Sequence, residues 1–164
     1  MENLHNISPD QWNKNVNAFH AESDRGAALL SGSFVENHLG IFLKSKIKNS
    51  DKADALFEGA GGLATFSQRI AIAYAFGFIG ATERNDLDLI RRIRNHFAHH
   101  PLDTSFKTHE VQQRIERLSN FQNDALQNPI DTQHRTTYLI ACALISAFFT
   151  IHIEHPRLEF RRHE

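Results

Sequence analysis

The sequence predicts an all-α fold, a single-domain helical bundle of five to seven helices over residues 1–164. Apolar residues recur at steps of three and four in successive stretches, which is the spacing of one helix face. No stretch shows the two-residue alternation that is typical of a half-buried strand. Short connections separate the periodic stretches, and they favour an up-and-down arrangement of neighbouring helices.

The composition is that of a single soluble domain. Of 164 residues, 41% are hydrophobic and 23% are charged, and this length suits one domain with a real core. The single cysteine, Cys142, excludes an internal disulfide and fits a reducing compartment. The first ten residues lack the basic and apolar parts of a secretory signal, so we expect a cytoplasmic protein.

The first third of the chain reads as one long helix or two nearly collinear helices. Ser8 and Pro9 are typical of a helix start, because serine caps the first turn and proline is tolerated within it. From there an apolar periodicity continues to about residue 47. We expect a break in the helix near Glu22.

Two shorter helices follow, over residues 51–57 and 63–76. Between them, residues 59–62 are rich in glycine but lack the Lys-Ser/Thr of a phosphate-binding loop and follow no strand, so they predict a tight turn. Thr82 and Glu83 are the expected cap of the next helix.

The most informative stretch is residues 86–101, which combines an apolar helix face with a polar cluster. Pro101 disfavours helical geometry at the residue before it, so the helix should end within the histidines that precede this proline. A helix C-terminus carries partial negative charge and favours cations, so the cluster is either a C-terminal cap or a phosphate site. The apolar face consists of Leu87, Ile90, Ile93 and Phe97, and the polar residues are Arg91, Arg92, Arg94, Asn95, His96, His99 and His100.

Two further helices are expected in the C-terminal part, one after Thr108 and a final one from about residue 131 to His155. Residues 139–151 are apolar on nearly every side but too few to span a bilayer, so we expect no membrane insertion. A helix of this kind is buried by neighbours or by a partner chain. This apolar excess predicts a homodimer.

The charge balance argues against binding to duplex DNA over a whole surface. The net charge is −1, whereas proteins that hold a duplex by themselves usually carry a strong basic surplus. We therefore expect weak or no specific DNA binding. A small anion or a short RNA segment remains compatible with the local groups of arginines.

A metal site would need more ligands than the spacing offers. His96 and His100, and likewise His152 and His155, have helical spacings that allow each pair to ligate zinc. No cysteine cluster or third acidic ligand stands at a matching distance. We therefore predict no metal and no cofactor.

Two family resemblances rest on these residues. Arg94 and His99, with Asn95 after the arginine, are similar to the Arg-(four to six residues)-His signature of HEPN domains. Over residues 22–106 the chain more specifically resembles the mannitol operon repressor (MltR) family. The matching blocks are Glu22-Ser23-Asp24-Arg25-Gly26-Ala27, Leu56-Phe57-Glu58-Gly59, Leu63-Ala64-Thr65-Phe66-Ser67 and residues 89–99.

The MltR resemblance implies a transcription regulator or co-regulator. Because the sequence has no DNA-reading motif, we expect it to act through protein partners, as a homodimer. In this interpretation the polar residues hold the fold together or contact a partner, and Arg94 pairs with Asp24 or Glu36. The polar cluster of this hypothesis is Asp24, Arg25, Glu36 and Arg91.

The HEPN resemblance implies the alternative, a metal-independent endoribonuclease of a toxin–antitoxin or phage-defence system. Its catalytic residues would be Arg94, Asn95 and His99 at a dimer interface. His99 would transfer a proton and Arg94 would stabilise the transition state, since arginine matches phosphate oxygens. Five residues on an ideal helix are about 140° apart, so contact within one chain would require the helix to end at His99.

Overall fold

The computed structural model describes residues 18, 21–48, 50–100, 104–121 and 133–155. Within these residues the chain is all helical, with six helices and no strand, which confirms the predicted fold class. The helix start predicted at Ser8 and Pro9 and the start of the final helix predicted at about residue 131 lie outside the described residues. The helices are α2 (Asp24–Lys46), α3 (Ser50–Phe57), α4 (Phe66–Ala75), α5 (Ala81–His99), α6 (His109–Ile115) and α7 (Gln133–Glu154).

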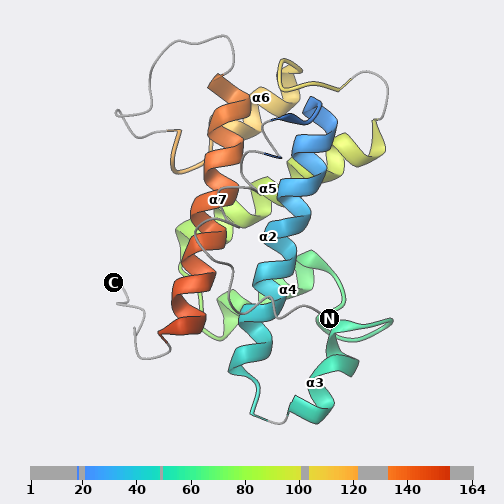
Figure 1. Cartoon of the computed structure of the whole chain (residues 1–164), viewed down its shortest axis with the longest axis vertical. Helices are drawn as coiled ribbons and strands as arrows, with labels where there is room; N and C mark the ends of the chain where they lie inside the picture. The colour runs from blue at the N-terminus through green and yellow to red at the C-terminus, as the bar shows by residue number, and fades with distance from the viewer. Residues whose placement is uncertain (1–17, 19–20, 49, 101–103, 122–132, 156–164) are drawn as a thin grey trace.

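The two long helices α2 and α7 lie side by side and run in the same direction (Figure 1). Contacts at both ends fix this parallel arrangement. Arg135 at the start of α7 pairs with Asp24 at the start of α2, and Lys46 at the end of α2 donates to the carbonyl oxygen of His152 near the end of α7, at 3.4 Å. The expected up-and-down order is therefore wrong for this pair, because α3 to α6 carry the chain back before α7 begins.

Helix α5 crosses the α2–α7 pair obliquely and supplies much of the core (Figure 1). All four predicted apolar residues of α5 are fully buried. Aromatic rings extend this core: Phe97 packs against Phe106, Phe106 against Tyr138, and Phe42 stacks on Phe149 with the ring centroids 5.1 Å apart. The prediction that this face of α5 is internal is confirmed.

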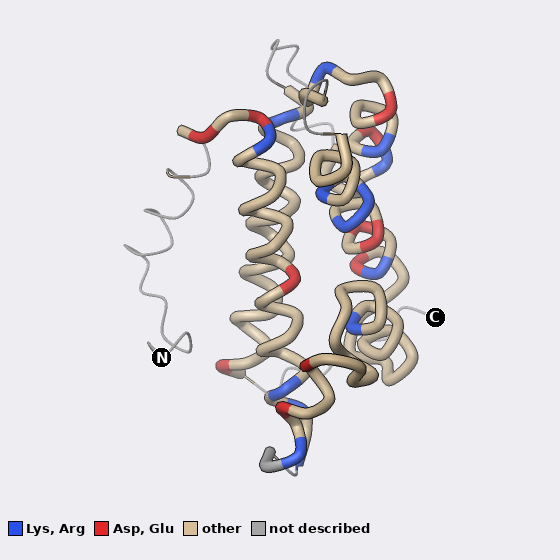
Figure 2. Tube along the Cα trace, turned by 90° about the vertical axis from the view of Figure 1, so that its right-hand side faces the viewer, with Lys and Arg blue, Asp and Glu red and all other residues tan. Residues whose placement is uncertain are grey.

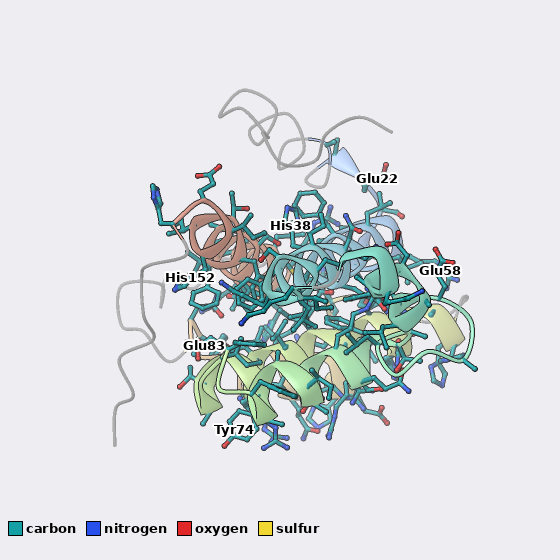
Figure 3. All side chains as sticks on the ribbon, turned by 90° about the horizontal axis from the view of Figure 1, so that it is seen from below. Glu22, His38, Glu58, Tyr74, Glu83 and His152 are labelled. Carbon is teal, nitrogen blue, oxygen red and sulfur yellow. The ribbon has the colours of Figure 1, made fainter. Side chains whose placement is uncertain are left out.

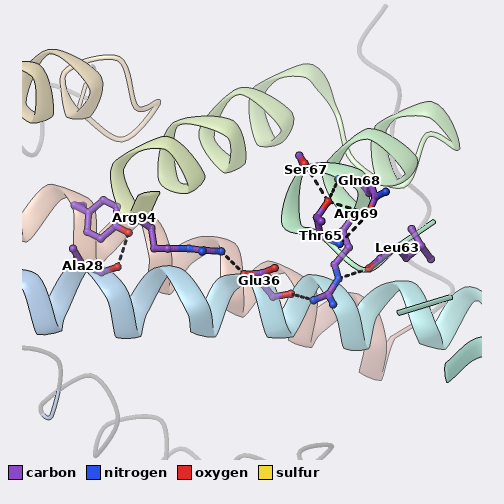
Figure 4. A network of polar contacts seen from close by, with 9 residues as sticks. Ala28, Glu36, Leu63, Thr65, Ser67, Gln68, Arg69 and Arg94 are labelled. Carbon is purple, nitrogen blue, oxygen red and sulfur yellow. Dashed lines mark hydrogen bonds and ion pairs between the residues drawn. The ribbon is translucent and has the colours of Figure 1, made fainter. Parts of the chain in front are cut away.

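Helix α4 begins three residues later than the sequence predicted. The side chain of Thr65 accepts a hydrogen bond from the backbone N–H of Gln68, and the Gln68 side chain accepts one from the backbone N–H of Thr65 (Figure 4). This reciprocal capping box ends the preceding turn and starts the helix at Phe66. The expected tight turn after α3 is present, with Gly59 in the left-handed region at a φ of +56°.

Helix α5 begins at Ala81, where Gly80 is the N-cap and its N–H donates to the Glu83 carboxylate at 2.9 Å. Glu83 thus has the expected capping function, whereas Thr82 lies inside the helix and is not the cap. The helix ends at His99, with His100 as the C-cap. The predicted end within the histidine cluster is confirmed.

Helix α7 is only partly covered. Thr137, Tyr138, Ser146 and Phe149 are among its buried residues, but Leu144 is 57% exposed and Ile151 is 46% exposed. The whole of α7 is long and apolar enough to cross a membrane, whereas the sequence prediction counted only residues 139–151. Length and composition are weak evidence for a membrane span, since the buried core helix of a soluble protein meets the same criteria.

Candidate functional site

Arg94 on α5 and Glu36 on α2 form an ion pair between the two helices (Figure 4). The arginine Nη2 atom donates to the Glu36 carboxylate, and the guanidinium also lies over the Phe66 ring, 5.8 Å from its centroid. Glu36 is one of the two partners that the sequence proposed for Arg94. The positive charge of Arg94 is therefore neutralised within its own chain.

The stem of Arg94 is packed where α2 and α5 come close together. A Cβ atom placed on Gly32 would lie 2.9 Å from Cβ and Cγ of Arg94 and 2.9 Å from the hydroxyl oxygen of Tyr138. The Tyr138 hydroxyl donates to the carbonyl oxygen of Ala28 at 3.1 Å. Glycine at position 32 thus permits the approach that places Arg94 next to Glu36.

Asp24 holds a separate contact at the N-terminal end of α2. Its carboxylate accepts a hydrogen bond from Nη1 of Arg135 at 2.6 Å and another from the backbone N–H of Phe106 at 3.0 Å. Asp24 was the other proposed partner of Arg94, and the structure does not pair these two residues. The parallel packing of α2 and α7 brings Arg135 to Asp24 instead.

Arg25 and Arg91 also lie in different environments. Nη1 of Arg25 donates to the carbonyl oxygen of Phe97 at 2.5 Å, so it satisfies a backbone acceptor near the end of α5. Arg91 pairs within α5, with Nη2 3.1 Å from a carboxylate oxygen of Asp88. The residues predicted as one polar cluster are thus distributed over separate contacts along α2 and α5.

The three residues predicted to be catalytic differ in their environments. Arg94 is turned toward Glu36 (Figure 4). Asn95 is partly buried, and His99 is exposed at the last residue of α5. His96 stacks on His100 with the ring centroids 4.4 Å apart, and its Nδ1 lies 3.6 Å from the Glu110 carboxylate. Partial burial lowers the pKa of His96, and the nearby His100 lowers it further.

The histidine pairs lack further metal ligands in the part of the chain that the structure describes. No group of three or more histidine, cysteine, aspartate or glutamate side chains is placed to hold an ion there. In the second pair, Nδ1 of His152 lies 2.8 Å from the carbonyl oxygen of Phe148. In this structure His96 and His100 contact each other, and His152 contacts a carbonyl group of its own helix.

Sequence reasoning did not find two arginines of this network. Arg135 joins α7 to Asp24, and its Nη2 donates to the carbonyl oxygen of Glu22 at 2.6 Å. Arg69 donates to the carbonyl oxygens of Leu63 and Glu36, at 2.8 and 3.2 Å, which ties α4 to α2 (Figure 4). The conspicuous Asp24-Arg25 pair indicated that partners exist, but nothing in the spacing identified Arg135.

The described residues form an all-helical bundle in which Arg94, at the centre of the predicted site, is paired with Glu36 of the same chain. In a comparison with protein families, residues 27–146 match the model of the mannitol repressor family, MtlR. This match covers well over half of the chain. The chain belongs to the mannitol repressor family.

Among solved structures, the chain is similar to the X-ray structure of the MtlR–HPr complex from Escherichia coli. The TM-score is 0.69 with 17% sequence identity, and the match covers 85% of this chain and 98% of that chain. At this identity the likeness shows the fold. No curated protein sequence matches the chain.

Proposed function

We propose that this protein is a cytoplasmic transcription regulator or co-regulator that acts by binding a protein partner. The observation that carries the proposal is the match to the mannitol repressor family over residues 27–146. The fold supports it, because the bundle resembles a protein that was crystallised with HPr. HPr is therefore the partner we propose to test first.

The charge distribution supports a protein partner over duplex DNA. The net charge is −1, and two arginines of α5, Arg94 and Arg91, are paired with Glu36 and Asp88. Helix α5 carries both acidic and basic residues, whereas residues 26–43 of α2 contain one charged residue, Glu36, and α7 has none between Arg135 and Glu154 (Figure 2). Such a surface gives little of the phosphate neutralisation on which duplex binding depends.

We further propose that the protein is a homodimer formed through the outer face of α7. Residues 136–153 contain no lysine, arginine, aspartate or glutamate, and Leu144 and Ile151 are exposed on this helix. A second copy offers the same apolar, uncharged face, and a two-fold axis brings identical faces together. Burial of this face in a dimer removes it from water.

Purified protein tests the partner proposal directly. We expect a stable complex with HPr in size-exclusion chromatography and titration calorimetry at micromolar concentrations. The same preparation should bind duplex DNA weakly, without sequence preference, at physiological salt. Sequence-specific, nanomolar binding to DNA in the absence of any other protein would overturn the proposal.

The ribonuclease alternative has less support from the geometry. It requires the Arg94 guanidinium to face a substrate phosphate, whereas that group is paired with Glu36. Incubation with single-stranded RNA and a chelator provides the test. Cleavage by the wild type that is absent in a folded His99→Ala variant would favour the enzyme over the regulator.

A further inference from the structure

A polar hollow lies on the outer side of α5, away from the Arg94 contact. Its volume is about 180 Å³. Arg84, Asn85, Asp88 and Arg92 line it from successive turns of α5, and Arg117 lines it from the turn after α6. Three arginines from two segments of the chain therefore surround one space.

These three arginines are exposed, and none forms an ion pair with a described acidic residue. The acidic residues nearby have other partners. Asp88 is paired with Arg91, and Glu83 caps the N-terminus of α5 through the N–H of Gly80. The positive charge of the three arginines around the hollow is thus left uncompensated within the described part of the chain.

Arg84 is held in place from a second helix. Its guanidinium lies over the ring of Tyr74 on α4, 5.0 Å from the ring centroid. Figure 3 shows nitrogen-tipped side chains beside Tyr74, on the side of α4 and α5 that is turned away from α2 and α7. Stacking of this kind reduces the freedom that an arginine would lose when it binds an anion.

We propose that this hollow binds a small phosphate monoester. Guanidinium groups match phosphate oxygens with paired, charge-assisted hydrogen bonds, and three of them together suit a dianion better than a single carboxylate. The Asn85 amide adds a neutral donor and acceptor at the same place. The Asp88 carboxylate repels an anion, but Arg91 neutralises it, and its oxygens can accept hydrogen bonds from hydroxyl groups on the remainder of the ligand.

The site is independent of the partner-binding proposal, since it would give the regulator a small-molecule ligand of its own. The phosphate can come from free phosphate or from a hydroxylated monoester. Inorganic phosphate and glycerol 3-phosphate distinguish these sources, and glycerol at equal concentration tests for binding without the phosphate. If Asp88 contributes as described, glycerol 3-phosphate binds more tightly than inorganic phosphate.

Titration calorimetry in a phosphate-free buffer at constant ionic strength measures the binding. We expect saturable, one-to-one binding of glycerol 3-phosphate, weakened about tenfold in each of Arg84→Gln, Arg92→Gln and Arg117→Gln, which is the loss of one charge-assisted contact. Arg114→Gln is the matched control. It removes the same charge, but Arg114 pairs with Glu110 and does not line the hollow.

Circular dichroism and the melting temperature check that each variant is folded, which is expected for exposed arginines. No saturable binding of either phosphate by the folded wild type would overturn the proposal. Equal weakening by Arg114→Gln would also overturn it, because the effect would then come from the total charge. Loss of HPr binding alone would leave this site unaffected.

Discussion

Arg94 and Glu36 are 58 residues apart in the sequence and form one ion pair between α5 and α2. Both side chains are 22% exposed, so the pair is largely shielded from water. The buried Nε atom of Arg94 makes no hydrogen bond in the described structure, so the contact depends on the Nη2–carboxylate bond. An ion pair in this environment holds the two helices in one register.

Arg94→Ala should lower the free energy of unfolding by about 2–4 kcal/mol, between the values for an exposed pair and a fully buried one. The reason is that the Glu36 carboxylate, which is 22% exposed, would lose its ion-pair partner between the two helices. Urea denaturation followed by circular dichroism measures the change. Arg92→Ala, an exposed arginine on the same helix, should shift stability by no more than about 0.5 kcal/mol.

The same interface predicts the effect of a single methyl group at Gly32. Gly32→Ala should destabilise the protein by about 1–3 kcal/mol, because the added Cβ would lie 2.9 Å from two Arg94 atoms and from the Tyr138 hydroxyl. Gly62→Ala is the matched control, since a Cβ there meets nothing within 4 Å. Thermal unfolding of both variants provides the comparison. Equal stability of the two would show that α2 and α5 can separate at no cost.

The sequence predicted α5 well because two independent signals coincide there. The spacing of Leu87, Ile90, Ile93 and Phe97 defines its buried face, and Pro101 limits its end. The later start of α4 shows a competing local signal, since the capping box of Thr65 outweighs the apolar periodicity before it.

The partners of the polar residues were harder to predict, because they depend on how distant helices pack. Glu36 was one of two candidates for Arg94, but the Asp24–Arg135 contact joins residues 111 positions apart. It exists because α2 and α7 run parallel, which no local pattern in either helix encodes. Arg91 shows the converse, since a partner three residues before it, Asp88, was close enough to exclude a distant one.

The buried His38 predicts a pH dependence of stability. Burial lowers the pKa of His38 below 6.5, against the opposing effect of its 3.0 Å contact with the carbonyl oxygen of Phe34. Below pH 6.5 the unfolded chain therefore binds a proton that the native state does not, and the free energy of unfolding falls as the pH is lowered. Urea titrations between pH 7 and pH 5 should show this loss, reduced in His38→Gln.

The wild type must be compared with His38→Gln because Asp86 changes the free energy of unfolding in the opposite direction as the pH falls. Burial raises its pKa above 3.8 against the hydrogen bonds from Ser119, so the cost of its buried charge decreases as the pH falls through the native pKa. If the slope of the free energy of unfolding against pH is unchanged in His38→Gln, His38 is excluded as the source of the pH dependence.

The last prediction concerns the proposed dimer and the exposed face of α7. Leu144→Glu should convert a wild-type dimer into an 18.7 kDa monomer in sedimentation at micromolar concentration, because a carboxylate would replace an apolar contact at the two-fold interface. Leu144 is 57% exposed in the single chain, so the substitution should leave the helical signal and the fold intact. Leu56→Glu is the matched control, since Leu56 is similarly exposed at 41% but lies on α3. A wild type that sediments only as the monomer would contradict the dimer, and dissociation of the dimer by Leu56→Glu but not by Leu144→Glu would place its interface on α3.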